Sequence, residues 1–423
     1  MQCFQQTYPE IQIYIYCGED TDAKDLAIHS MERFNIKVEP TFVALSLPNR
    51  DLLNPSNYPR LTMVRQAIAS VRVACTALDR LVPEVWIDTT GWAFPYPIIR
   101  SLGSRIVAYV HYPTISTDML DRVEKRQEAF NNSSSVARSS HASRIKLLYY
   151  QAFAFVYGLC GGFATIAMVN SSWTRGHISK LWWGHHEPSL VYPPCDTTSF
   201  QALPLDRSLK KIIVASVAQF RPEKNHELQL RALAKTKAQA KVVTDSRLAD
   251  AIMQLTFVFI GGCRGQEDRE RVQKLKDMAQ ELGLDDSSVE FKLNAPFSDL
   301  QNILGKAIAG IHSMENEHFG ISVVEYMASG AIPIAHATAG PKQDIVVPEK
   351  ILGQLQPTGY LCTTVEEYSR ALIKVLSMTH SERLRMAEAG RIRSKRFSDQ
   401  RFQIDFASTL APVVQKLSPS IKR

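Results

Sequence analysis

Short, continuous runs of apolar residues alternate along the whole chain with stretches that are long enough to form helices. Strands that are buried on both faces give such unbroken runs, as in parallel sheets that are covered by helices. The alternation of strands with helices therefore predicts an α/β protein. The expected strands are Ile11–Tyr16, Val85–Asp88, Ile106–Val110, Ile166–Val169, Ile212–Val217, Phe257–Ile260, Ala309–His312 and Ile332–Ala335.

The 423 residues are enough for two such domains, and a proline pair at 193–194 suggests a hinge between them. We predict a Rossmann-like first domain at residues 1–195, a linker at 196–210 and a Rossmann-like second domain at 211–400. Residues 401–423 are expected to form a C-terminal helix, and its return to the first domain is left open. Ligands of such sheets bind beyond the carboxyl ends of the strands, which predicts a binding cleft between the domains.

Composition narrows the classes of function. The net charge of +7 fits an anionic ligand or a membrane surface, but it is too small to indicate nucleic-acid binding. The seven cysteines contain no Cys-x-x-Cys pair, so neither a zinc site nor a disulfide framework is predicted, and a reducing compartment is favoured. The uncharged run Leu147–Asn170 is interpreted as a buried helix that turns into a buried strand, with a membrane span as the alternative.

Two glutamates, Glu317 and Glu325, stand eight positions apart and enclose a short apolar run. Gly320 is expected to open a helix and Gly330 to end it. Glu317 then lies in the loop before the helix N-terminus, and Glu325 lies on the helix wall. Free backbone N–H groups and the helix dipole suit a phosphate group at this end, and a carboxylate beside it suits sugar hydroxyls. An ordinary strand–helix–strand unit with two surface acids is the alternative.

Two cations, Arg221 and Lys224, follow directly after the expected strand Ile212–Val217. An arginine fork and a lysine point charge suit a diphosphate, and they would stabilise a departing nucleoside diphosphate. Ordinary surface charge is the alternative. Gly262, the second of a glycine pair at another strand end, would permit close approach of the backbone to a ligand, although such pairs are common.

His111 stands at the end of the expected strand Ile106–Val110 and faces the predicted cleft. It could donate a hydrogen bond to a transferred sugar or tune charge at the reacting carbon. A structural histidine with satisfied partners is an equally good interpretation.

From Ala129 to His186 the chain has no aspartate or glutamate, although basic and aromatic residues are frequent there. Such a segment could form a basic, aromatic face against an anionic membrane or a diphosphate-linked lipid. The residues proposed for this acceptor or membrane face are Arg138, Arg144, Lys146 and Trp173.

Several blocks together resemble glycosyltransferase family 4, which has the GT-B fold of two Rossmann-like domains. More specifically, they are similar to the α-1,2-mannosyltransferases of the asparagine-linked glycosylation pathway, over nearly the whole chain. The blocks are His111–Leu120, Val169–Thr174, Val191–Asp196, Gln219–His226 and Asn316–Glu325.

The resemblance implies transfer of mannose from GDP-mannose, with retention of configuration, to the dolichol-diphosphate-linked oligosaccharide Man(3)GlcNAc(2), as its fourth and fifth mannoses. It implies no cofactor and no metal, a place on the cytosolic face of the endoplasmic reticulum membrane, and contact with other mannosyltransferases of the pathway as an option. The roles that it implies are donor diphosphate binding for Arg221 and Lys224, mannose binding for Glu317 and ribose binding for Glu325. Phe319 and Gly320 would offer backbone N–H groups, and His111 would face the mannose.

The sequence departs from the family's pattern at the N-terminus, where the family has a membrane anchor, a first strand and a glycine-rich loop. Gly18 is the only glycine before Gly91, so a truncated first domain without its first strand is expected. This leaves acceptor binding and anchoring open. Two alternatives to the enzyme are a catalytically silent, membrane-associated partner of other mannosyltransferases and a sugar-nucleotide epimerase with the same fold.

Overall fold

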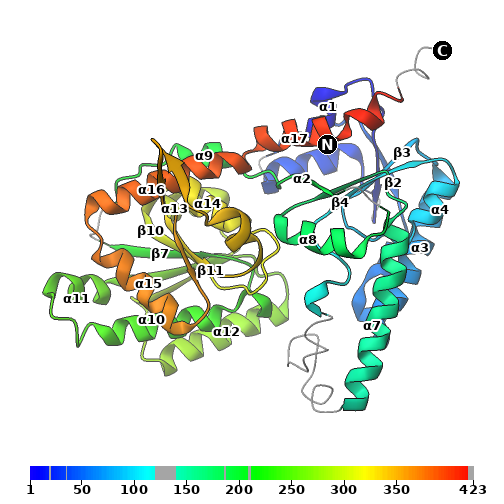
Figure 1. Ribbon diagram of the computed structural model, residues 1–423. Coiled ribbons are helices and arrows are strands. Elements are labelled where there is room, and N and C mark those ends of the chain that lie inside the picture. The colour runs from blue at the N-terminus through cyan, green and yellow to red at the C-terminus, as the bar shows by residue number, and fades with distance from the viewer. Residues whose placement is uncertain (19–20, 35, 120–139, 185–186, 208–210, 418–423) are drawn as a thin grey trace. The chain divides into compact units, whose positions relative to one another are not determined.

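The structure is a computed structural model that describes residues 1–18, 21–34, 36–119, 140–184, 187–207 and 211–417 (Figure 1). The chain forms two compact units. The first consists of residues 1–170, 174–191 and 403–423, and the second of residues 171–173 and 192–402. Each unit is a parallel sheet with helices packed on it, so the predicted α/β class is confirmed.

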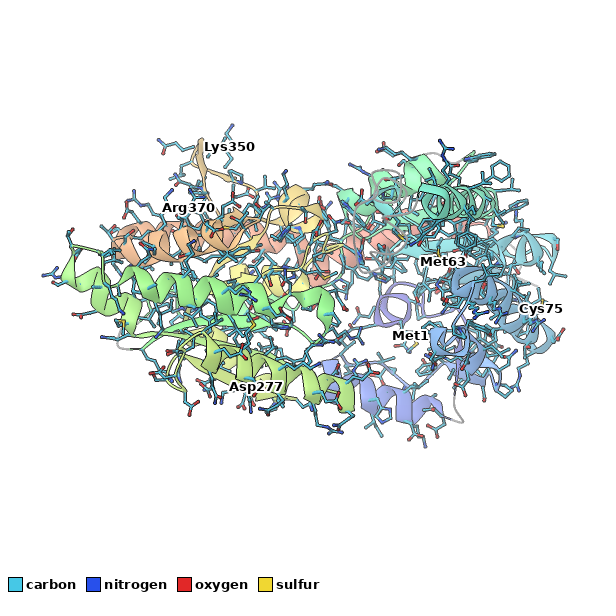
Figure 2. All side chains as sticks on the ribbon, turned by 90° about the horizontal axis from the view of Figure 1, so that it is seen from below. Met1, Met63, Cys75, Asp277, Lys350 and Arg370 are labelled. Atoms are coloured by element: carbon cyan, nitrogen blue, oxygen red, sulfur yellow. The ribbon has the colours of Figure 1, made fainter. Side chains whose placement is uncertain are left out.

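The second unit is built on one six-stranded parallel sheet with the order β14-β11-β10-β7-β8-β9. The strands are β7 Ile212–Val217, β8 Leu255–Gly261, β9 Val289–Leu293, β10 Ala307–His312, β11 Ile332–His336 and β14 Tyr360–Cys362. The helices are α9 Thr197–Gln201, α10 His226–Gln239, α11 Ser246–Met253, α12 Gln266–Glu281, α13 Phe297–Lys306, α14 Ile321–Ser329, α15 Val365–Ser377, α16 His380–Ser394 and the start of α17 Asp399–Val414. A short antiparallel hairpin, β12 Glu349–Ile351 and β13 Gln354–Gln356, projects from this unit near Lys350 (Figure 2).

Two apolar layers hold this sheet, one on each face. Phe257 and Phe259 of β8 pack with α10, α12 and α15, while Ala215 and Ile260 pack with α9, α13 and α14. On the second face Gly310 of β10 makes room for the ring of Tyr326, because a Cβ atom at position 310 would overlap that ring. Tyr326 also accepts a hydrogen bond from the Val217 N–H at 2.7 Å, which ties α14 to the end of β7.

The first unit has a four-stranded parallel sheet of order β3-β4-β5-β6 and a separate parallel pair, β1-β2. The strands are β1 Tyr14–Cys17, β2 Val43–Ser46, β3 Val85–Asp88, β4 Arg105–Val110, β5 Ile166–Val169 and β6 Ser189–Leu190. The helices are α1 Gln2–Thr7, α2 Ala23–Phe34, α3 Thr62–Arg80, α4 Tyr96–Ser101, α7 Ser140–Gly161 and most of α8 Ser172–Leu181.

The predicted strands are all present, with one shift at the N-terminus. The expected strand Ile11–Tyr16 is β1 at Tyr14–Cys17, because its partner β2 begins only at Val43, opposite Tyr14. The prediction missed β2, β6, β9 and the three short strands after residue 348, which carry no long apolar run.

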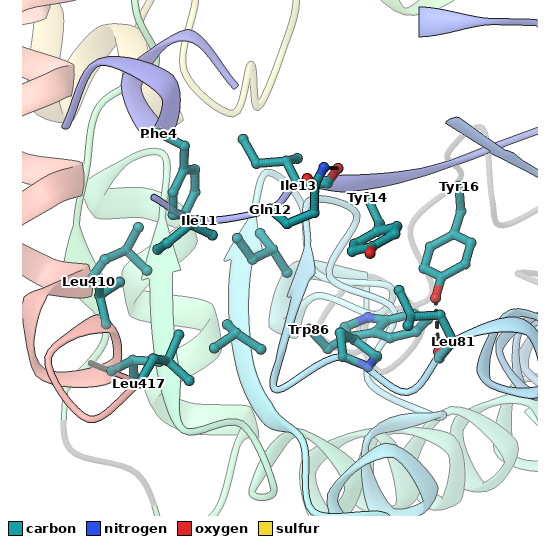
Figure 3. A pocket seen from close by; sticks show the side chains of 15 residues that line it. Phe4, Ile11, Gln12, Ile13, Tyr14, Tyr16, Leu81, Trp86, Leu410 and Leu417 are labelled. Atoms are coloured by element: carbon teal, nitrogen blue, oxygen red, sulfur yellow. Dashed lines mark hydrogen bonds between the residues drawn. The ribbon is translucent and has the colours of Figure 1, made fainter. Parts of the chain in front are cut away.

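A break in the first unit separates β1 from β3. A cavity of about 170 Å³ lies there, lined by apolar side chains of both strands and of α17, among them Tyr14, Trp86 and Leu410 (Figure 3). Tyr16 spans the break by stacking on Trp86 and donating a hydrogen bond to the Leu81 carbonyl at 3.0 Å.

The run Leu147–Asn170 forms the second half of α7 and then β5, as predicted. The interpretation of a buried helix was wrong for one side of α7, however. Tyr150, Phe153 and Tyr157 are buried on one side of α7, while the opposite side exposes large apolar side chains such as Leu148. None of the helices in the described ranges is both long and apolar enough to cross a membrane.

Candidate active site

The loop Glu315–Gly320 and the helix α14 form the centre of the candidate site. Gly320 is the N-cap residue with a φ of 110°, and Gly330 is the C-cap residue with a φ of 91°, so the predicted helix limits are confirmed. In the described part of the chain, the N–H groups of Phe319 and Gly320 donate no hydrogen bond. The N-terminal end of α14 therefore presents open donors together with the positive end of its dipole.

A neighbouring loop fixes this segment. The backbone N–H of Asn316 donates to the Thr338 hydroxyl at 2.8 Å, and the N–H of Gly340 donates to the Glu317 carbonyl at 3.0 Å. Gly340 lies so close that a Cβ atom there would overlap the backbone of Phe319. The loop that carries Glu317 is therefore held by the neighbouring segment 338–340 through these two hydrogen bonds.

Glu317 receives two hydrogen bonds through one carboxylate oxygen. Lys224 Nζ lies 2.5 Å from Oε2, and His312 Nε2 lies 3.1 Å from the same atom. The Glu317 side chain is 14 % exposed. Burial alone would raise its pKa, but the hydrogen bonds and charges of His312 and Lys224 outweigh burial and lower the pKa below its ordinary value. Glu317 is therefore a carboxylate at neutral pH.

Local backbone geometry brings Lys224 to this place. Strand β7 ends at Val217, and Pro222–Lys224 then form one 3₁₀ turn, which is followed by Asn225 in the left-handed region with a φ of 50°. Asn225 caps α10 with its side-chain oxygen. The Ser313 hydroxyl donates to the carbonyls of Lys224 and Asn225, so the turn after β7 is tied to the segment after β10.

Arg221 lies on the same turn but points to solvent. Its Nη1 is 4.0 Å from Glu223 Oε1, a weak exposed contact, and nearly half of its side chain is accessible. An anion could take over this guanidinium at little cost, since an exposed ion pair contributes little stability.

The two glycines at the end of β8, Gly261 in the strand and Gly262 after it, differ in their surroundings. A Cβ atom at Gly261 would overlap the Ala218 carbonyl, whereas one at Gly262 would meet only Gln219 Cγ at 3.9 Å. Gly261 is therefore needed for packing of the strand ends. Gly262 has open space beside it. This position is compatible with its predicted role in donor binding, which stays a prediction.

Glu325 lies on the wall of α14 and is half-buried. Burial raises its pKa from 4.5 to about 7, and the nearby charge of Asp196 adds to this effect. Glu325 makes no hydrogen bond or ion pair with any residue in the described ranges. A ribose hydroxyl would supply the donor that this carboxylate lacks.

His111 belongs to the first unit and directly follows β4, as predicted. Its ring lies against Tyr109, with 4.6 Å between the ring centroids. The predicted role of His111 is to face the mannose. Because this role would involve residues of both units, it stays a prediction.

The proposed acceptor or membrane face is corrected at one residue. Trp173 is only 8 % exposed and stacks on His318 with 5.4 Å between ring centroids, so it cannot face a membrane. Arg144 is exposed on α7, and Lys146 lies over the Tyr150 ring. Arg138 lies outside the described residues.

Two contributors to the site, His312 and Asp344, were not predicted from the sequence. His312 is the last residue of β10, and its place at a strand end was the available signal. Asp344 is buried and accepts hydrogen bonds from the N–H and the hydroxyl of Ser172 and from the Tyr192 hydroxyl. This contact holds Ser172 and Trp173 in the second unit beside His318, and it joins positions too far apart in sequence for any motif to reveal.

No group of three or more metal-binding side chains is found among the residues that the structure describes. Arg221 and Lys224 are two cationic side chains that this site offers to an anionic ligand.

Comparisons with solved structures show the fold. Sucrose-phosphate synthase from Thermosynechococcus elongatus superimposes with a TM-score of 0.64 at 17% identity, over 90% of this chain and 86% of that chain. The α,α-trehalose 6-phosphate synthase from Burkholderia multivorans superimposes with a TM-score of 0.66 at 12% identity, over 96% and 98%. The chain therefore has the GT-B fold, as predicted.

Sequence comparisons narrow this class. Residues 1–182 match the family "ALG11 mannosyltransferase N-terminus", and residues 201–393 match "Glycosyl transferases group 1". The human GDP-Man:Man(3)GlcNAc(2)-PP-Dol alpha-1,2-mannosyltransferase is 40% identical over 416 residues, which cover 97% of this chain and 82% of the relative. The Caenorhabditis elegans protein of the same name is 38% identical over 422 residues, or 98% and 87%. The chain belongs to this family of α-1,2-mannosyltransferases, which confirms the predicted family and enzyme class.

Proposed function

We propose that this chain transfers mannose from GDP-mannose in α-1,2 linkage to the dolichol-diphosphate-linked Man(3)GlcNAc(2), as the fourth and fifth mannoses. The names of the relatives give the reaction, and the close pair Lys224–Glu317 at the N-terminus of α14 carries the proposal for this chain. The acceptor lipid places the reaction at a membrane, for which we propose the cytosolic face of the endoplasmic reticulum.

The donor diphosphate would lie at the N-terminus of α14. Open N–H groups of Phe319 and Gly320, the Lys224 ammonium and the exposed Arg221 guanidinium all favour negative charge there. Their effect is largest when the sugar–phosphate bond breaks, because the leaving diphosphate then gains charge. These groups act without a metal ion in the proposed mechanism.

Glu317 would accept hydrogen bonds from hydroxyl groups of the mannose. Its lowered pKa keeps the carboxylate ionised, as this role requires. Lys224, which donates to Glu317 in the structure, would share its remaining hydrogens with a donor phosphate oxygen, since an ammonium group has three. One lysine then fixes both the sugar-binding carboxylate and the leaving group. Glu325 would accept from the ribose.

Calorimetry of GDP binding tests this arrangement. We expect GDP to bind more tightly than UDP, with equal affinity in EDTA and in Mn²⁺. Arg221→Met and Lys224→Met should each weaken GDP binding about tenfold to a hundredfold, the loss of one charge-assisted contact. Arg247→Met, an exposed arginine on α11, is the control and should bind as the unchanged chain does. GDP binding that requires Mn²⁺, or an affinity for GDP that is unchanged in both variants, would refute the proposed donor site.

A further inference from the structure

One side of α7 forms a continuous exposed apolar stripe. Its members recur every three or four positions, and Phe155 and Val156 are adjacent, so all fall on one side of the helix. Leu148 is 69 % and Phe155 is 52 % exposed, although both are large apolar residues. The exposed residues of the stripe are Ile145, Leu148, Ala152, Phe155, Val156 and Leu159.

A groove of about 420 Å³ lies between side chains of α7 and α3. Figure 1 labels these two helices of the first unit. Ala152 and Val156 belong to both the stripe and the groove, so the two are one surface. Ile68 of α3 lines the far wall and is half exposed. The lining is almost wholly apolar, and its volume is within the range of ligand sites. Figure 2 shows α3 with Met63 and Cys75 labelled.

The charges and aromatic groups around this surface fit a lipid. Helix α7 contains no aspartate or glutamate, and Arg144 is exposed near its N-terminal end, where it can meet a lipid phosphate. Trp183 is half exposed beside Phe155, with 4.7 Å between the ring centroids in an edge-on arrangement. Tryptophan is favoured at the boundary between lipid chains and headgroups. Because the apolar side chains lie on one side of α7 only, the helix would lie in the plane of the surface with this side toward the lipid.

We infer that the groove between α3 and α7 binds the hydrocarbon chain of the lipid-linked acceptor, while the stripe rests on the bilayer that supplies it. This inference rests on the proposed function for the identity of the lipid. It replaces the predicted face that included Trp173 with a surface that keeps Arg144 and adds Trp183.

The groove is tested by filling it. Ala152→Trp places an indole in the groove, and Gln151→Trp adds the same indole one position away, outside the lining. Binding of a fluorescent polyprenyl diphosphate is measured, which requires no mannose transfer. We expect Ala152→Trp to weaken binding at least tenfold and to raise the KM for the long-chain acceptor similarly, and Gln151→Trp to do neither.

The stripe is tested by flotation with vesicles of phosphatidylcholine and phosphatidylserine. Leu148→Asp should lose at least half of the bound fraction, while Val242→Asp, an equally exposed site on the second unit, should keep it. Equal flotation of the two variants, or dimerisation of the unchanged chain through this stripe, would overturn the inference. If Ala152→Trp loses probe binding but the unchanged chain transfers no mannose, only the proposed function is refuted. Transfer with normal probe binding in Ala152→Trp would refute only the groove.

Discussion

Lys224 Nζ lies 2.5 Å from Glu317 Oε2, and the two residues follow the adjacent parallel strands β7 and β10. Parallel strands bring their carboxyl ends to one edge of the sheet, so residues far apart in the chain meet there. The pair is mostly buried, and His312 completes it. One cation thereby holds the carboxylate that we assign to sugar binding next to the helix end that we assign to phosphate.

This pair predicts a stability effect that requires no substrate. Lys224→Met should lower the free energy of unfolding by about 2 kcal/mol, because it leaves Glu317 with a single hydrogen-bonding partner in a mostly buried place. Urea unfolding measures this loss. Lys274→Met, on the exposed side of α12, should change stability by less than about 0.5 kcal/mol. In a double-mutant cycle, Glu317→Gln should cancel part of the loss. Additive effects would contradict the contact.

The adjacent glycines at the end of β8, Gly261 and Gly262, give a matched pair of variants. Gly261→Ala forces a methyl group into the Ala218 carbonyl, and separating these strand ends should cost about 2–3 kcal/mol. Gly262→Ala has room for its methyl group and should cost less than about 1 kcal/mol. Thermal unfolding compares the two, and equal losses would mean that the strand ends do not approach as described.

The raised pKa of Glu325 predicts a pH-dependent stability. The unfolded carboxyl ionises near 4.5 and the folded one at about 7, so the folded state holds an extra proton between these values. Stability contributed by this group is therefore lost as the pH rises through that window. Glu325→Gln cannot ionise and should be more stable than the unchanged chain at pH 8, by about 1–2 kcal/mol, and similar at pH 4. Chemical denaturation at both pH values checks this, and parallel pH profiles would contradict it.

The parts of the fold that sequence predicts best are those with local causes. Helix α14 was bounded correctly because glycine is favoured at both of its ends, and most of the strands were found because they are buried on both faces. The buried interpretation of α7 failed for a physical reason. An apolar run shows that a helix is hydrophobic, but it does not show which side of the helix packs against the protein. Only one side of α7 is packed.

The site was predicted in part. The positions of Glu317, Lys224 and the helix N-terminus follow from strand ends and helix signals. The contacts of His312, Asp344 and Trp173 depend on packing between distant segments, which a single sequence does not encode locally. Trp173 illustrates the limit, since an aromatic residue in a basic segment suggested a surface role, but its ring is buried against His318.

Mannose transfer itself tests the central claim most directly. Radiolabelled GDP-mannose is incubated with Man(3)GlcNAc(2)-PP-lipid and the chain, and the product is digested with an α-1,2-specific mannosidase. We expect one and then two added mannoses that the mannosidase releases. Glu317→Gln should lower kcat at least a hundredfold, with a smaller change in GDP affinity. No transfer by a folded chain that binds GDP, or undiminished transfer by Glu317→Gln, would contradict the account.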